Sequence, residues 1–189
     1  MVENWKQALR RLTSQFSGAG AGAAIMTAAQ GSDSDRAAAL IMASFVDIAM
    51  NGLIIYAIRV SDQTAVNQLF MSDQSPLYDF GAKITFCKAV HIIGNDTAYN
   101  LDIIRKIRNT FAHALDDINF KTKEISKACS LLILDKEHTR LSNRLKFGIA
   151  CDVIYQRVLH LLFSRQLSGS LAEKSIRSPI TAVIIALTA

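Results

Sequence analysis

The stretch RKIRNTFAH, residues 105–113, places residues that can do acid–base and anion chemistry within nine positions. Metal-free RNA cleavage needs a histidine that moves a proton and an arginine that holds the charge developing on phosphorus. Arg108 and His113 are such a pair, and Asn109 could position a phosphate. The stretch therefore suggests a ribonuclease in which Arg108 and His113 are catalytic and no metal takes part.

Helix geometry constrains that hypothesis. Five residues along an ideal helix turn about 500°, so Arg108 and His113 point about 140° apart. Two copies of the chain about a two-fold axis could share one cleft, each contributing part of the site. The hypothesis therefore predicts a homodimer with these helices at its interface. The alternative is that His113 has an ordinary structural role, as a single histidine on a helix most often does.

A polar stripe on an apolar helix is the second candidate feature. The segment Arg36–Val60 is almost entirely apolar, but Ser44, Asp47 and Asn51 follow each other at helical spacing. A buried aspartate needs a counter-charge or several hydrogen-bond donors. We therefore expect Asp47 to face Arg108 or Arg105. Such a pair could be purely structural, or it could help to hold a bound anion.

The composition predicts an all-α fold. Half of the 189 residues are hydrophobic, a fifth are charged, and only two are proline. Strict apolar–polar alternation is scarce, which favours helices over strands. We expect a single-domain helical bundle of six to eight helices. The apolar segment 36–60 is long enough to cross a bilayer, but a charge at the centre of such a helix costs about 2.5–3.5 kcal/mol. Asp47 therefore argues for the middle of a soluble bundle.

The chain divides into three parts. Residues 1–32 are predicted to form a short helix, 2–16, and a flexible Gly/Ala segment, 17–24. Residues 33–167 form the bundle core, and residues 168–189 form a C-terminal helix or apolar tail. The predicted helices of the core are 36–60, 61–70, 80–93 with a stop at Gly94, about 96–115, a short segment near 125–134, and 143–166. We expect helix 36–60 to pack on helices 80–93 and 96–115.

Other residue types point to no cofactor. Cys87, Cys129 and Cys151 form no C-x-x-C pair, and the four histidines lack a metal-ligand spacing, so no metal is assigned. The N-terminus lacks the pattern of a signal peptide, which predicts a cytoplasmic protein. The net charge of +5 arises entirely after residue 135. This basic region is either a set of solvated helix faces or a surface for nucleic acid or an acidic partner.

Three segments in order resemble the mannitol operon repressor family: DRAAALIMASFVDIAMNGLI (35–54), LFMSDQSPLYDFGAKITFCKAVHIIG (69–94) and YNLDIIRKIRNTFAHALDDINF (99–120). The resemblance covers about residues 33–135 and lies in the order and spacing of the motifs. It implies an all-helical transcriptional regulator that acts through a protein partner rather than by reading DNA directly. It adds no information on mannitol itself.

RNTFAH also resembles the R-x4-6-H signature of HEPN domains, helical bundles that include dimeric metal-independent ribonucleases. That resemblance implies a catalytic role for Arg108 and His113, with Asn109 as polar neighbour and Asp47 as supporting acid. Asn51 and Arg105 complete the candidate binding or supporting residues. The first functional hypothesis is thus a regulator of the mannitol repressor type, and the alternative is a HEPN-like ribonuclease that binds RNA. A third possibility is an interaction module without chemistry.

Overall fold

The computed structural model describes residues 20–31 and 34–169 of the chain, and within them it contains seven α-helices, a short 3-10 helix and no strand. The predicted all-α bundle is therefore confirmed. In chain order the helices are α2 (Gly20–Gln30), α3 (Asp35–Ala57), α4 (Gln63–Phe70), α5 (Phe80–Ala89), α6 (Asn95–His113), α7 (Lys123–Ser130), η1 (Lys136–His138) and α8 (Asn143–Gly169).

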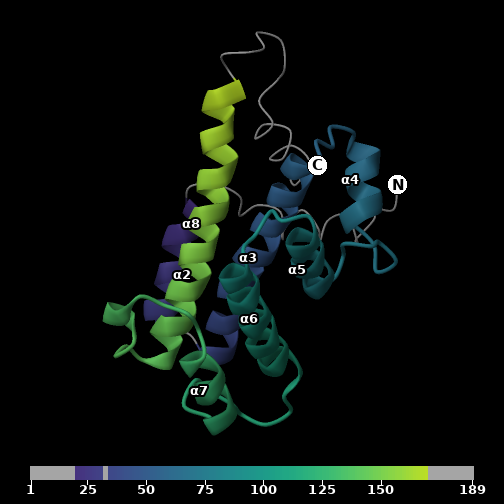
Figure 1. Cartoon of the computed structure of the whole chain (residues 1–189). Coiled ribbons are helices and arrows are strands. Elements are labelled where there is room, and N and C mark those ends of the chain that lie inside the picture. The colour runs from purple at the N-terminus through teal and green to yellow at the C-terminus, as the bar shows by residue number, and fades with distance from the viewer. Residues whose placement is uncertain (1–19, 32–33, 170–189) are drawn as a thin grey trace.

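Helix α3 is the central element of the bundle. It packs against α2 and α8 on one side and against α5 and α6 on the other (Figure 1). Met42, Val46, Met50 and Ile54 on α3 are completely buried. A helix that is apolar on every side is stable in water only when neighbours cover most of its surface, which is the arrangement seen here. The predicted packing of this helix on the helices at 80–93 and 96–115 is confirmed.

By length and composition alone, α3 would also qualify as a membrane-spanning helix. Its most apolar 18-residue window has a mean hydropathy of 2.0, and 61% of that window is buried inside the protein. The core helix of a soluble bundle has the same composition, because it too exchanges water for apolar neighbours on most of its surface.

Helix α2 was not expected from the sequence. Residues 17–24 were predicted to be flexible because of their glycines, but the part from Gly20 onward is helical and packs against α8 and α3. A small residue on α8 permits this contact: a Cβ atom added to Gly148 would lie 2.4 Å from the Cβ of Ala29. Packing between helices has thus outweighed the low helix propensity of glycine.

Side-chain caps define several helix starts. The Ser34 hydroxyl accepts from the Ala37 amide at the start of α3, and the Asp62 and Asp79 carboxylates cap α4 and α5 in the same way. Each of these side chains satisfies an amide that has no partner within its own helix.

The predicted end of α5 was wrong. The helix ends at Ala89, and His91 adopts a left-handed backbone with φ 56°. The Ile92 amide then donates to the Cys87 carbonyl, which closes the helix. Gly94, expected to stop α5, is instead the N-cap residue of α6. The predicted helix 2–16 and the apolar tail from residue 170 lie outside the described residues.

Candidate functional site

Asp47 of α3 is half-buried rather than fully buried, and it has a counter-charge, but not the predicted one. Lys83 Nζ on α5 lies 2.6 Å from Asp47 Oδ1, and the side chains are 5% and 30% exposed respectively. In the described part of the chain, neither Arg105 nor Arg108 lies within ion-pair distance of Asp47. The predicted arginine partner was therefore wrong, whereas the expected need for a cationic partner was correct.

A sequence signal for Lys83 existed. Phe80, Ile84 and Cys87 are buried along one side of α5, and Lys83 is buried with them. A lysine among apolar residues at helical spacing needs a carboxylate, just as Asp47 needs a cation. Asn51, one turn beyond Asp47, is half-buried, and its Oδ1 atom is buried with no hydrogen-bond partner among the described residues.

Arg105 is engaged on its own helix. Its Nη2 atom donates to Asp102 Oδ1 at 2.8 Å, and Lys106 Nζ lies 2.6 Å from the other oxygen of the same carboxylate. Burial raises the pKa of Asp102, but the hydrogen bonds from Lys106 and Arg105 outweigh it and hold the pKa below its usual value. The Arg105 side chain also lies over Gly81, where an added Cβ would be 3.4 Å from Nε.

Arg108, Asn109 and His113 occupy the C-terminal half of α6. Arg108 is half-buried, and its Nη1 atom donates to Asn109 Oδ1 at 3.0 Å. His113 is the last residue of the helix and is exposed. Because α6 is continuous between the two, Arg108 and His113 keep the angular separation of about 140° expected on an ideal helix. One chain therefore places them on the same segment but does not aim them at a common point.

The end of α6 meets the start of α3 at a set of long-range hydrogen bonds that the sequence analysis missed. Arg36 Nη2 donates to the carbonyls of Ala114 at 2.9 Å and Asp116 at 3.0 Å. The Asp35 carboxylate accepts from the Phe120 amide at 2.8 Å and pairs with Arg144 at 3.1 Å. Residues 114–119, here called the junction loop, are thus tied to α3 at both ends.

These bonds explain one motif. The first segment that resembles the mannitol operon repressor family begins with Asp35 and Arg36, and these two side chains organise the junction loop. Burial of the Asp35–Arg144 pair is substantial, with side chains 23% and 16% exposed. The sequence offered no signal for these contacts, because Phe120 and Arg144 lie 85 and 109 positions after Asp35.

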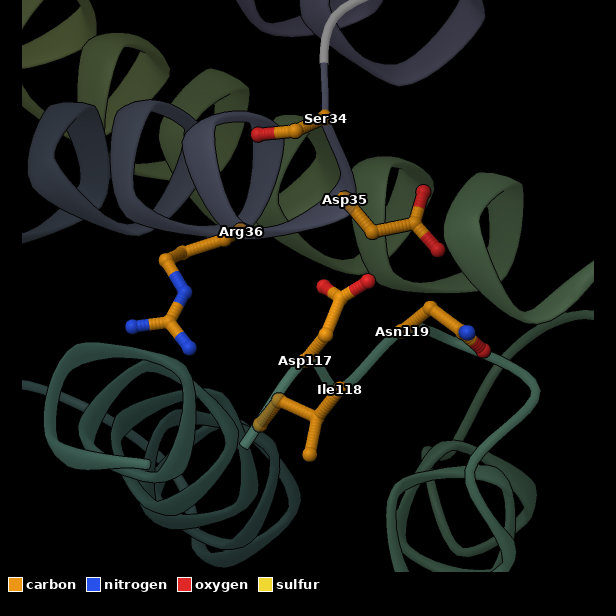
Figure 2. Close-up of a pocket in the computed structure, with 6 residues that line it drawn as sticks. All are labelled: Ser34, Asp35, Arg36, Asp117, Ile118 and Asn119. Atoms are coloured by element: carbon orange, nitrogen blue, oxygen red, sulfur yellow. The ribbon is translucent and has the colours of Figure 1, made fainter. Parts of the chain in front are cut away.

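A cavity of about 310 Å³ opens between the start of α3 and the junction loop. Figure 2 shows the Asp117 carboxylate directed toward the start of α3, between the side chains of Arg36 and Asp35. The residues that line the cavity all have polar or charged side chains except Ile118; they are Ser34, Asp35, Arg36, Asp117, Ile118 and Asn119. Such a lining suits a polar or charged group better than an apolar one.

The remaining reactive side chains offer little chemistry. Burial raises the pKa of the Cys87 and Cys129 thiols to about 12 and that of the Cys151 thiol well above its ordinary value, which keeps all three protonated and weakly nucleophilic. Side-chain ligand atoms of Asp135, Glu137 and His138 lie within 4.8 Å of one another. Both acids are exposed to solvent, and we assign no metal to this group.

Comparison with protein-family models found no match, and comparison with curated proteins found none either. Among solved structures, the X-ray structure of the MtlR–HPr complex from Escherichia coli matches with a TM-score of 0.59 at 13% identity. The match covers 75% of this chain and 99% of that one. The chain has an MtlR-like fold. At this identity the likeness concerns the fold alone, and it agrees with the fold that the resemblance to the mannitol operon repressor family implies.

Proposed function

We propose that the chain is a transcriptional regulator of the mannitol operon repressor type that acts by binding another protein. The observation that carries the proposal is the MtlR-like fold. It spans 99% of the neighbour's chain, and that neighbour was crystallised in complex with HPr. The neighbour was crystallised bound to another protein, and we infer that this chain, which has a similar fold, also binds one.

The charge pairs within the bundle support a binding protein rather than an enzyme. Lys83 is committed to Asp47 and joins α5 to α3, and Arg105 is committed to Asp102 one turn earlier on α6 itself, so both cations are used in ion pairs within the bundle. Several large apolar side chains are instead exposed and available to a partner; Tyr78, Leu115, Leu131 and Ile133 are each about half exposed or more. Apolar anchors within a polar surface are typical of protein interfaces.

Isothermal titration of the purified chain with purified E. coli HPr tests the proposal. We expect a dissociation constant of about 1–10 µM, at the weak end of the range for protein interfaces of ordinary size. An unrelated small protein of similar charge is the control. If the titration shows no heat of binding and the two proteins do not co-elute at 100 µM, the likeness to the neighbour no longer supports the proposed function. A reporter assay for transcriptional repression in cells then tests the regulatory part separately.

A HEPN-like, metal-independent ribonuclease is the second candidate. The guanidinium of Arg108 has no carboxylate partner in residues 34–162, and it is oriented by Asn109 on the same helix that ends with the exposed His113. A guanidinium without a carboxylate partner and an exposed imidazole suit charge stabilisation and proton transfer at a phosphodiester. Because one chain separates the two groups angularly, this function requires a homodimer.

Incubation with total RNA in EDTA distinguishes the two candidates. A ribonuclease would cleave RNA, and both His113→Ala and Arg108→Ala would abolish cleavage while circular dichroism stays unchanged. The exposed His91→Ala variant is the control and should retain activity. Intact RNA with the wild-type chain, together with a monomeric mass in solution, would exclude this candidate.

A further inference from the structure

The backbone on either side of Leu115 is held in a shape that leaves the Leu115 side chain in solvent. Its side chain is fully exposed, at 101% of the reference area. The two peptide carbonyls that flank it, those of Ala114 and Asp116, both accept hydrogen bonds from Arg36 Nη2. The guanidinium comes from about 80 positions earlier in the chain, so the tertiary structure holds the loop in this shape.

This arrangement differs from an ordinary exposed leucine. Single apolar side chains on a surface are common and need no explanation. Here the backbone on both sides of the side chain is anchored, and the Phe120 amide bonded to Asp35 anchors the far end of the junction loop. Binding through a loop usually costs free energy because the loop must become ordered. The junction loop is already held in place, so a partner that buries Leu115 loses little affinity in this way.

The charge around Leu115 indicates the kind of partner. Asp116 and Asp117 follow it directly, and residues 109–120 contain no lysine or arginine, although the whole chain carries a net charge of +5. Both aspartates are exposed. The cavity of about 310 Å³ beside the loop, into which Asp117 points, has room for a long cationic side chain (Figure 2). Self-association through this loop would bring the aspartates of two copies together and is disfavoured.

We propose that the junction loop, residues 114–119, is the docking site for a protein partner whose surface offers an apolar pocket for Leu115 bordered by Lys or Arg side chains. Those cations meet Asp116 and Asp117, and the one that meets Asp117 enters the cavity. This inference rests on the proposed function, because it assigns a surface to the protein partner proposed there.

Binding kinetics with E. coli HPr as the probe test the assignment. Leu115→Ala should raise the dissociation constant at least about tenfold, about 1.4 kcal/mol, mainly through faster dissociation. The double variant D116N/D117N should slow association and flatten its dependence on salt between 50 and 500 mM. Leu161→Ala removes a leucine that is 37% exposed on α8 and should bind as the wild type does.

The outcomes separate the two proposals. If the wild type binds HPr and the loop variants bind equally well, the docking site is elsewhere and the proposed function stands. If the wild type does not bind, the HPr-based function and this assignment both fail. If light scattering shows a dimer that Leu115→Ala converts to a monomer, the loop is a self-association surface and the assignment to a basic partner is overturned. Unchanged melting temperatures of the variants show that the effects are local.

Discussion

The ion pair between Asp47 and Lys83 leads to an asymmetric prediction about stability. Removing either partner leaves the other charge inside the bundle, but the two are buried to different degrees. The Lys83 side chain is 5% exposed, whereas that of Asp47 is 30% exposed. We therefore expect Asp47→Ala to destabilise the fold more than Lys83→Met, because it strands the charge that has less access to water.

The magnitude follows from the burial of each group. Breaking a buried pair by removing one partner typically costs about 3–5 kcal/mol. Asp47→Ala should lie at the lower end, at about 3 kcal/mol, because the lysine stem can bend toward the opening that Asp47 leaves. Lys83→Met should cost about 1–2 kcal/mol, because methionine fills the space of the lysine stem and the carboxylate stays partly hydrated.

Urea unfolding followed by far-UV circular dichroism measures both values. For a domain of this size, a loss of 3 kcal/mol corresponds to a melting temperature lower by about 6–12 °C. The double variant should be less destabilised than the sum of the two single changes, because the second substitution removes the stranded charge. Lys106→Met is the matched control; its ion pair with Asp102 is largely exposed, and the change should cost less than about 1 kcal/mol.

Two results would refute this reasoning. If Asp47→Ala is as stable as the wild type, then Lys83 does not depend on the carboxylate. If Lys83→Met is the more destabilising of the two, then burial of the charges does not set the order of their effects.

Three further predictions concern the packing, the backbone and the thiols. Gly148→Ala should destabilise by about 1–3 kcal/mol in spite of its better helix propensity, since the new Cβ would lie 2.4 Å from that of Ala29, and Ala29→Gly should restore the loss in urea unfolding. Arg59→Gly should stabilise by about 0.5–1 kcal/mol in the same assay, because Arg59 has a left-handed φ of 56°, and a loss would indicate a role for its side chain. The Cys87 thiol, with a pKa raised to about 12 by burial, should resist a thiol reagent at pH 8 until the chain unfolds. Since the unfolded thiol ionises near pH 8.5, its contribution to stability should be present below that pH and decline as the pH rises toward 12, as measured by unfolding at a series of pH values.

The sequence by itself determined the class of fold and most of its elements. Residues 36–60 are apolar apart from one polar stripe, so most of their surface had to be covered by other helices, and Asp47 in the stripe had to meet a cation. Both conclusions follow from the composition and periodicity of a single segment. Any neighbouring helix that covered the segment and offered a cation would satisfy them. The long helix α8 could be predicted from its amphipathic pattern, and the short α4 from the polar residues that cap its start.

Only the tertiary structure decided which residues meet. The periodicity of a helix shows which of its sides is buried. It does not show which neighbouring helix covers that side, or how far the two helices are shifted along their axes. The choice of Lys83 over Arg105 as the partner of Asp47 depends on that relative placement of α3, α5 and α6. The junction loop depends on it as well, because Arg36 and the carbonyls beside Leu115 are distant in sequence and come together only when α3 and α6 run side by side in opposite directions. The helix of residues 20–30 likewise forms where its glycines and alanines can approach α8 closely, a contact that local propensity alone opposes.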